Sequence, residues 1–205
     1  MIIAFISLKG GVGKSTLAVH AYGYAKREGM SVWLVDTDIQ GSASQWLDAI
    51  DPEANCYHLT DASDAEKAVK ARNADSDIVI IDGGAGLVEP TKVGLMLADV
   101  VVIPTKASRL DYTATMEVLR LANQAKVARG KKAAQVIVVP SMIQAGQLVT
   151  SQLLDELDEL SVPVGPAIHQ RASFAKCAGE NYVWNQKDNN ATAEVEMLMQ
   201  SIIEK

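Results

Sequence analysis

The sequence predicts an α/β fold in which a doubly wound, mostly parallel sheet carries helices on both faces. Short apolar, β-branched runs recur along the chain, and a segment with helical spacing follows each of them. The runs are continuously apolar, which indicates strands buried on both faces between two layers of helices. The expected strands are Ile2–Ser7, Ser31–Asp36, Ile78–Asp82, Asp99–Pro104, Gln135–Pro140 and a weaker Val162–Ile168.

Helices are expected between and after these strands. The first runs from Lys14 to about Glu28, where Gly29 supplies a left-handed stop. The last has apolar residues at helical spacing and therefore one apolar face. The polar stretch Asn185–Asn190 is expected to be a loop. The other helices are expected near Ser42–Ile50, Asp64–Asn73, Thr91–Leu97, Thr113–Ala128, Leu148–Leu160 and Ala191–Ile203.

Length and composition favour one globular domain over residues 1–205. With 48% hydrophobic and 21% charged residues, and no long uncharged apolar stretch, the chain is expected to be soluble. The apolar start lacks a basic leader, so a cytoplasmic location is expected. A formal net charge of −6 gives no overall attraction to nucleic acid or anionic lipid, so either partner requires a local patch. Cys56 and Cys177 have no metal-binding spacing and are expected to be free thiols.

A glycine-rich segment directly follows the first expected strand and directly precedes the first helix. Its glycines allow successive backbone N–H groups to point into one concavity, and the helix N-terminus adds its positive end, so a polyphosphate site is predicted. In such a loop Lys14 reaches the β- and γ-phosphates, the Ser15 hydroxyl binds Mg²⁺, and Thr16 lies near the α-phosphate. The expected nucleotide contacts in this segment are Lys9, Gly10, Gly11, Val12, Gly13, Lys14, Ser15 and Thr16.

A second lysine, Lys9, opens this loop. The form KGGxGK[ST] is the deviant Walker A motif, and the chain resembles the ParA/MinD family of P-loop ATPases. In that family the first lysine crosses to the partner subunit's nucleotide, so the resemblance implies ATP, Mg²⁺ and a homodimer that forms on ATP binding. A cation from across the interface would offset the charge of two facing nucleotides, as an arginine finger does elsewhere. Lys9 and Lys14 are therefore expected to be catalytic.

Two aspartates at the end of the second expected strand look like the family's DxDPQG switch segment. Alternate residues of an extended segment point the same way, so Asp36 and Asp38 can both face the nucleotide if the strand continues through them. By resemblance, Asp36 serves the Mg²⁺ shell and Asp38 orients or activates the attacking water. Ile39 replaces the usual proline, a change that bears on the stiffness of the switch rather than on its chemistry.

The third strong strand, Ile78–Asp82, has the form of a Walker B strand, in which Asp82 holds Mg²⁺ through water. The glycines after it resemble the small plasmid-partition subgroup related to ParF. The N–H of Gly83 is expected near the γ-phosphate, which makes this loop a candidate second switch. The base is expected against Met142 and its two preceding residues, and against the segment around His169, whose own role is expected to be structural.

The resemblance implies an ATP-dependent dimerising switch that binds DNA without sequence preference and positions a plasmid, a chromosome region or a protein assembly. A ParB-like or cargo-adaptor protein would stimulate slow hydrolysis, and the ATP-bound form would be nucleoid-associated. A cationic helix end can also serve only dipole compensation and solubility. The candidate DNA patch comprises Arg120, Lys126, Arg129, Lys131 and Lys132, with Arg171 and Lys176 as possible members.

Other functions remain open at this point. Membrane attachment in the manner of MinD is disfavoured, because Glu194, Glu196 and Glu204 make the last helix acidic. A regulatory ATPase or scaffold that does not bind DNA, or a MinD-like positioning factor, is the main alternative. An iron-protein reductase related to nitrogenase needs two correctly placed cysteines per subunit, and Cys56 and Cys177 do not provide that arrangement.

Overall fold

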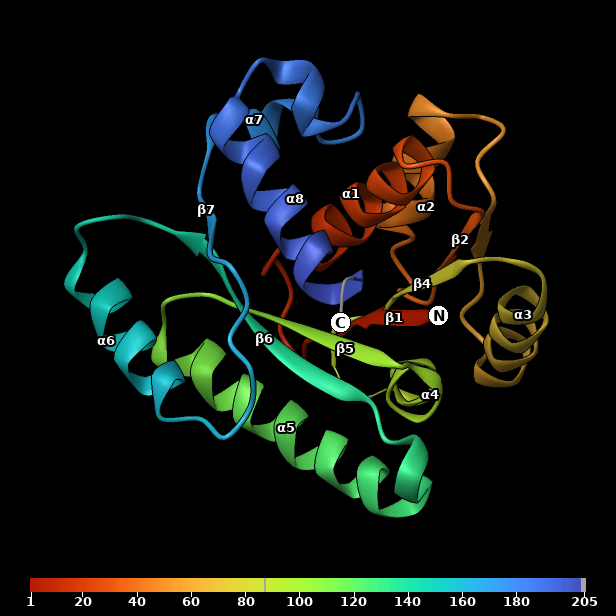
Figure 1. The fold of residues 1–205 in the computed structure, drawn as a ribbon, viewed down its shortest axis with the longest axis horizontal. Coiled ribbons are helices and arrows are strands. Elements are labelled where there is room, and N and C mark those ends of the chain that lie inside the picture. The colour runs from red at the N-terminus through yellow and green to blue at the C-terminus, as the bar shows by residue number, and fades with distance from the viewer. Residues whose placement is uncertain (87, 204–205) are drawn as a thin grey trace.

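The computed structural model describes residues 1–86 and 88–203, and a seven-stranded sheet forms its centre (Figure 1). The strand order is β3-β2-β4-β1-β5-β6-β7, and every neighbouring pair is parallel. The doubly wound parallel sheet predicted from the sequence is confirmed. The strands are β1 (Ile2–Phe5), β2 (Val32–Asp36), β3 (Cys56–His58), β4 (Ile78–Asp82), β5 (Val100–Thr105), β6 (Gln135–Ile143) and β7 (Ile168–His169).

The central strands are apolar throughout because they contribute to two cores. Along β1, Ile3 and Phe5 pack into the core on one face of the sheet, whereas Ile2 and Ala4 pack into the core on the other. Alternate residues of a strand point to opposite faces, so a strand covered on both sides favours apolar side chains at every position up to its carboxyl end, where Asp36 and Asp82 stand. This burial explains the continuous hydrophobic runs in the sequence.

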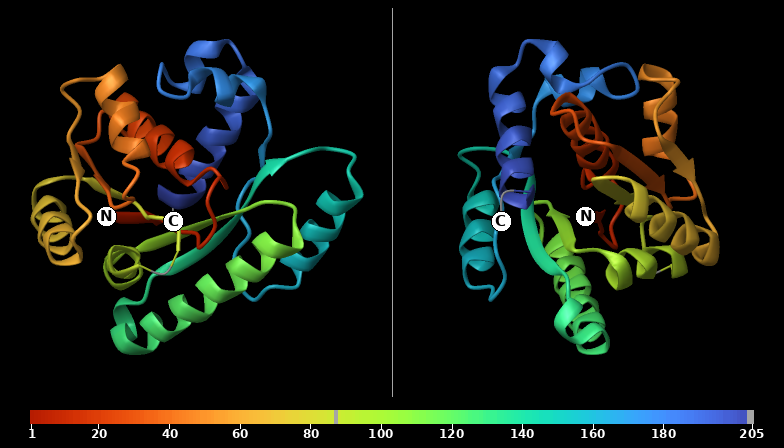
Figure 2. Two further views of the ribbon diagram at one scale, coloured as in Figure 1. Left: turned by 180° about the vertical axis from the view of Figure 1, so that it is seen from behind. Right: turned by 45° about the vertical axis from the view of Figure 1, so that its right-hand side comes forward.

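Two layers of helices cover the sheet (Figures 1 and 2). One layer holds α1 (Lys14–Arg27), α2 (Ser42–Ile50), α7 (Ala172–Cys177) and α8 (Asn189–Ile203), with the 3₁₀ helix η2 (Val183–Gln186). The other holds α3 (Ala62–Asp75), α4 (Glu89–Leu97), α5 (Arg109–Arg129) and α6 (Leu148–Asp158), with the 3₁₀ helix η1 (Gly130–Lys132). None of the helices in the described ranges has the length and apolar character needed to cross a bilayer.

The sheet topology fixes where a ligand can bind. Strand β1 lies between β4 and β5, and the register pairs Phe5 and Asp36 with Asp82. Since all strands run the same way, the loops that follow β1, β2 and β4 emerge together at the carboxyl edge. This is the edge at which open α/β sheets bind ligands, where the strand order reverses.

The sequence missed or misplaced the weakest strands. The edge strand β3 was not predicted, because its three residues are only half-buried or exposed and carry no apolar run. The predicted strand Val162–Ile168 is wrong over most of its length. Only Ile168 belongs to β7, and Val164 makes an isolated bridge to Val138.

Several helix predictions also need correction. The loop predicted at Asn185–Asn190 is wrong, because η2 extends to Gln186 and α8 already begins at Asn189. The short helix α7 was not predicted. Helix α5 begins earlier than predicted because the Ser108 hydroxyl accepts a hydrogen bond from the Asp111 N–H and caps the helix. Glu204, part of the predicted acidic tail, lies outside the described residues.

A buried histidine joins α1 to the C-terminal segment. The Nδ1 of His20 donates to the Thr16 carbonyl oxygen at 2.7 Å, and its Nε2 accepts from the Val183 N–H at 2.9 Å. Because both ring nitrogens are engaged in this way, the imidazole is neutral. Burial lowers the pKa of His20 to about 4, against a smaller opposing effect of the hydrogen bond to Thr16. The ring makes edge contacts with the aromatic rings of Trp46, Phe174, Tyr182 and Trp184.

This histidine should make stability fall in acid. The unfolded chain takes up a proton on the ring near pH 6.5, whereas the native protein does so only near pH 4. The free energy of unfolding should therefore drop by about 2 kcal/mol between about pH 6.5 and about pH 5 through this group alone. Urea unfolding of wild type and His20→Gln across this range, followed by tryptophan fluorescence, measures the difference in slope. The exposed His58→Gln is the control, and a His20→Gln slope equal to that of wild type would contradict the assignment.

Candidate nucleotide-binding site

The loop between β1 and α1 is shaped by glycines that adopt positive φ. Gly11 has φ 70° and Gly13 has φ 93°, a region that glycine reaches without strain. Between them Val12 is buried, and its carbonyl oxygen accepts a hydrogen bond of 2.8 Å from the Ser141 hydroxyl on β6. Helix α1 begins without a side-chain cap, so its positive end is available to an anion.

Lys14 is buried at the base of this loop. Its side chain is 5% exposed, and Nζ donates to the Lys9 carbonyl oxygen at 3.2 Å. Burial lowers the pKa of Lys14, while the negative charges of Asp82 and Asp38 oppose that shift. Lys9 itself is exposed. The two lysines thus occupy different environments, one buried at the base of the loop and one exposed to solvent.

An open cavity of about 840 Å³ lies against the loop. The loop after β2, the start of α2, the loop after β4 and the turn after α7 complete its walls. The lining residues are Gly10, Gly11, Gly13, Lys14, Ser15, Thr16, Asp38, Ile39, Gln40, Ser42, Gln45, Trp46, Ala85, Met142, Ala178 and Gly179. Most of the predicted phosphate-loop residues therefore face one cavity, together with Asp38 and Met142.

Asp82 is a fully buried carboxylate at the end of β4. Among the described residues neither of its oxygens has a partner with hydrogen-bond geometry, although the Ser15 hydroxyl lies close enough to act on its pKa. Burial and the neighbouring charge of Asp36 raise the pKa of Asp82 to about 8, against the opposing effects of Ser15 and Lys14. Buried polar atoms are normally satisfied, so a carboxyl group that this pKa keeps largely protonated at neutral pH points to a missing cationic partner that would ionise it.

The donor set around Asp82 fits hydrated Mg²⁺. Among the described residues there is no group of three His, Cys, Asp or Glu side chains that could hold a metal ion by itself. Magnesium in nucleotide sites is commonly held by one or two side chains, waters and the phosphates, so it needs no such group. The Ser15 hydroxyl and the Asp82 carboxylate are the protein groups that would hold it. Water and the phosphates of ATP would supply the rest of the coordination.

The place of Asp36 in the Mg²⁺ shell stays a prediction, and its carboxylate is engaged within the protein. Strand β2 ends at Asp36 and does not continue to Asp38. The two aspartates are therefore not alternate residues of one strand, and their side chains are not expected to point the same way. One Asp36 oxygen accepts the Asp38 N–H at 3.0 Å and the other accepts the Ser44 N–H at 2.9 Å. Asp36 thereby orders the loop and the first turn of α2.

Asp38 lies on the cavity wall, half-buried, as its predicted role requires. Its backbone is fixed from two sides: the Gly41 N–H and the His58 Nε2 both donate to its carbonyl oxygen, at 3.0 and 2.8 Å. The adjacent Gln40 N–H donates to one carboxylate oxygen at 3.0 Å. This loop is therefore ordered even though Ile39 stands in the place of a proline.

The Gly83 N–H was expected to be free to bind the γ-phosphate, and the structure contradicts this expectation. Its N–H donates to the Phe5 carbonyl oxygen at 3.0 Å, so it continues the sheet and is not free for a ligand. Gly83 is also tightly packed, because a Cβ at this position would lie 2.9 Å from the same carbonyl oxygen. Ala85, further along the loop, is the residue that reaches the cavity wall.

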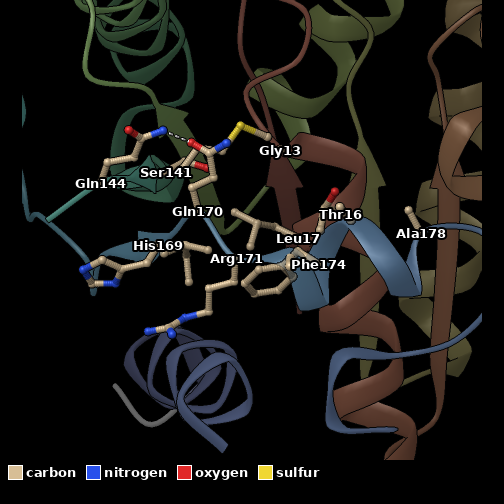
Figure 3. A pocket seen from close by; sticks show the side chains of 14 residues that line it. Gly13, Thr16, Leu17, Ser141, Gln144, His169, Gln170, Arg171, Phe174 and Ala178 are labelled. Atoms are coloured by element: carbon tan, nitrogen blue, oxygen red, sulfur yellow. Dashed lines mark hydrogen bonds between the residues drawn. The ribbon is translucent and has the colours of Figure 1, made fainter. Parts of the chain in front are cut away.

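A second cavity of about 630 Å³ continues from the loop toward the end of the sheet (Figure 3). Thr16 and Leu17 of α1, Ser141 and Met142 of β6, and Phe174 of α7 contribute to its mainly apolar wall. The predicted segment around His169 lines it as well, with Gln170 and Arg171. The two regions that the sequence assigned to the base are therefore brought together.

Met142 lies between the two cavities and has an unusual backbone. Its φ of 53° is in the left-handed region, which a residue with a side chain rarely adopts, and the register of β6 with β7 shifts at this point. The residue lines both cavities. Strained backbone of this kind concentrates at ligand sites, in agreement with the predicted contact.

The structure does not assemble the full predicted basic patch. Arg171 follows β7 at the carboxyl edge of the sheet, whereas Lys131 and Lys132 precede β6 at the opposite edge. Arg129 donates to the carbonyl oxygens of Leu95 and Ala98, at 3.1 and 2.6 Å, and so helps to hold α4. The exposed lysines at the end of α5 and in η1 remain.

Sequence reasoning missed the part of the site formed by α2 and the turn after α7. Trp46 is buried beside the cavity, and its Nε1 donates to the Asn181 carbonyl oxygen at 3.1 Å. Ala178 and Gly179 face it from the other side. Small residues in a turn carry no motif, and a lone tryptophan on a helix signals only core packing.

The fold and the site define a P-loop nucleotide-binding protein. The chain matches the family model described as CobQ/CobB/MinD/ParA nucleotide binding domain over residues 3–182. It belongs to this family, which confirms the ParA/MinD assignment made from the deviant Walker A motif.

Individual relatives agree with this assignment. Protein ParA of Rhizobium radiobacter is 26% identical over 204 residues, which is 95% of this chain and 91% of that protein. The structure of apo McdA from Cyanothece has a TM-score of 0.81 at 15% identity and covers 98% of both chains. MinD from Pyrococcus horikoshii OT3, solved with Mg-ADP, has a TM-score of 0.77 at 19% identity and covers 98% of this chain and 95% of its own. At these identities the structural likenesses show the fold.

Removing the Asp82 charge should uncouple the protein from Mg²⁺. Asp82→Asn keeps the side-chain volume but offers the cation no charge, so Mg²⁺ affinity in the presence of ATP should fall about 10–100-fold. Thermal unfolding with ATP, with and without Mg²⁺, measures this as a smaller Mg²⁺-dependent rise in Tm. Asp64→Asn on the exposed surface of α3 is the control. A full Mg²⁺ response in Asp82→Asn would place the metal elsewhere.

Proposed function

We propose that this chain is a Mg²⁺-ATP-dependent dimerising switch of the ParA type. It binds DNA without sequence preference and positions or segregates a plasmid, a chromosome region or a protein assembly. A ParB-like or cargo-adaptor protein stimulates its slow hydrolysis of ATP to ADP and phosphate. The observation that carries the proposal is the contrast within one loop: Lys14 is buried near Asp82, while Lys9 is exposed to solvent.

The residues divide the chemistry between charge and positioning. When bound, Mg²⁺ adds positive charge at the β- and γ-phosphates, and the Lys14 ammonium stands beside it. Asp38 is anchored through its backbone, so its carboxylate can orient the attacking water from the cavity wall. Phosphoryl transfer depends mainly on such positioning and electrostatic stabilisation. Ser15 and Asp82 are the residues that would hold the cation.

Exposed groups at the rim of the site support dimerisation. Ile39 lines the cavity and is 78% exposed, so it offers an apolar side chain that a second copy facing this edge could cover. Within the described chain the Lys9 ammonium has no ion pair. A second copy facing this edge would bury Ile39 and bring each Lys9 to the other copy's phosphates.

The DNA-binding part of the proposal rests on three exposed lysines at the opposite edge of the sheet, Lys126, Lys131 and Lys132. Two arginines of the predicted patch are engaged elsewhere: Arg120 pairs with Glu117, and Arg129 holds backbone carbonyls of α4 and the residue after it. A patch of this size gives weak attraction in one subunit. A dimer presents it twice, which raises the avidity for a long polyanion.

The alternative is a regulatory ATPase or MinD-like positioning factor that does not bind DNA. The formal charge of −6 favours it, as do the surface ion pair of Arg120 with Glu117 and the hydrogen bonds of Arg129 to backbone carbonyls. The geometry disfavours an iron–sulfur reductase. Cys177 is fully buried in the core and Cys56 lies half-buried on the edge strand β3, so the described structure does not present the two thiols together at one surface for a cluster.

Two variants should separate binding from hydrolysis. Asp38→Ala should retain ATP and persist as a dimer, with kcat reduced about 100-fold or more because the water is no longer oriented. Lys14→Ala should fail to dimerise at the same ATP concentration. Light scattering after size exclusion gives the mass, and phosphate release gives the rate. A fast, monomeric Asp38→Ala enzyme would contradict the assigned role.

Gel shifts on duplex DNA with ATP, with ADP and without nucleotide test the DNA-binding surface. Lys131→Glu/Lys132→Glu should lower the ATP-dependent affinity about tenfold or more at low salt, because it replaces attraction to phosphate with repulsion. Lys67→Glu/Lys70→Glu on α3 makes the same change of charge away from the patch and is the control. If wild type gives no shift in any nucleotide state, the regulatory alternative holds instead.

A further inference from the structure

Glu194 of α8 makes four hydrogen bonds to the wall of the second cavity. One carboxylate oxygen accepts from the His169 backbone N–H at 3.0 Å. The other accepts from His169 Nδ1 at 2.9 Å and from Arg171 Nε and Nη2 at 3.1 and 2.6 Å. The Glu194 side chain is only 12% exposed. A largely buried carboxylate that accepts four hydrogen bonds fixes the positions of its donors, which a solvated ion pair at the surface does not.

The residues that Glu194 holds are part of the cavity lining. His169 and Arg171 flank Gln170 where β7 leads into α7, and all three line the cavity. Figure 3 shows the Arg171 side chain directed toward α8 and away from Thr16 at the phosphate end. The guanidinium is therefore drawn out of the space that a base would occupy.

This placement has a consequence for base recognition. A guanidinium pairs with the O6 and N7 acceptors of guanine, whereas the corresponding edge of adenine presents an amino donor. Two of the Arg171 nitrogens are occupied by Glu194, and the ion pair raises the Arg171 pKa. Without Glu194, an unpaired guanidinium on the cavity wall could turn inward, where it would favour guanine and repel the amino group of adenine.

We propose that Glu194 is the positioning residue that sets base selectivity, favouring adenine over guanine by holding the donors of Arg171 outside the pocket. It acts through Arg171 and through the backbone of His169, and does not touch the nucleotide. Selectivity of this kind depends on removing an interaction that would stabilise the wrong ligand. The inference rests on the proposed nucleotide function of the two adjoining cavities.

Calorimetric titration with ATP, GTP and inorganic tripolyphosphate tests the proposal. Tripolyphosphate reports on the phosphate loop alone, because it carries no base. The variants are Glu194→Ala, Arg171→Ala and the double variant, with Glu194→Gln as the milder replacement should Glu194→Ala fail to fold. Glu196→Ala is the matched control, since it lies on the same helix and pairs with Arg27 at the surface.

In Glu194→Ala and Glu194→Gln the ratio of ATP affinity to GTP affinity should fall about tenfold. This is the size of effect expected when one bidentate arginine contact distinguishes guanine from adenine. Tripolyphosphate affinity should stay within about twofold. The double variant should recover much of the preference, because no arginine remains to enter the pocket. Glu196→Ala should match wild type.

The possible failures are distinguishable. An unchanged ATP-to-GTP ratio in both Glu194 variants would overturn this inference while leaving the nucleotide function intact, and so would a wild type that binds ATP and GTP equally. A parallel loss of tripolyphosphate and ATP would show that Glu194 supports only the fold. A wild type that binds neither ATP nor tripolyphosphate would overturn the proposed function and this inference with it.

Discussion

The geometry of the nucleotide site depends on one constraint, the burial of the Asp82 carboxylate without a hydrogen-bond partner. A buried, unsatisfied polar group costs roughly 1–3 kcal/mol, and more when it is charged. Its position at the end of β4, in register with Phe5 at the end of β1, places it directly behind the phosphate loop. Lys14 supplies part of the compensating charge, and its own burial is tolerated for the same reason. The fold is thus prepared for a further cation that arrives with the ligand.

Asp36 shows how strongly environment decides the role of a carboxylate. It ends the neighbouring strand, aligned with Asp82, and is equally inaccessible to solvent. Yet its two oxygens accept the N–H groups of Asp38 and Ser44, so it is satisfied within the protein. One aspartate orders the switch loop and the other lacks a partner. The sequence around Asp36 and Asp82 does not distinguish these roles. The difference arises because the chain after β2 folds back over Asp36 and brings two N–H donors to its carboxylate, whereas no such donor reaches Asp82.

The predictable parts of the structure are those in which the chemistry is local. The phosphate loop could be predicted because the glycines, Lys14 and Ser15 must be contiguous to surround a phosphate. The central strands could be predicted because burial on two faces favours continuous apolar runs. Gly83 was misassigned because a hydrogen bond to Phe5, distant in the sequence, continues the sheet beyond the aspartate. The contacts of Glu194 were also unpredictable. An acidic residue on a C-terminal helix has the pattern of a solvated surface until the fold brings β7 beside it.

The C-terminal segment that carries η2 and α8 makes hydrogen bonds at both the phosphate end and the base end of the site. It therefore connects the two cavities structurally. At the phosphate end, the Val183 N–H holds His20, which in turn holds the Thr16 carbonyl oxygen in the first turn of α1. At the other end, Glu194 holds Arg171. Thr16 lines both cavities, so a displacement of the segment that carries η2 and α8 would alter the phosphate loop and the base pocket together. A ligand that spans the cavities would resist that displacement, so nucleotide binding should stabilise the C-terminal segment as well as the loop it contacts.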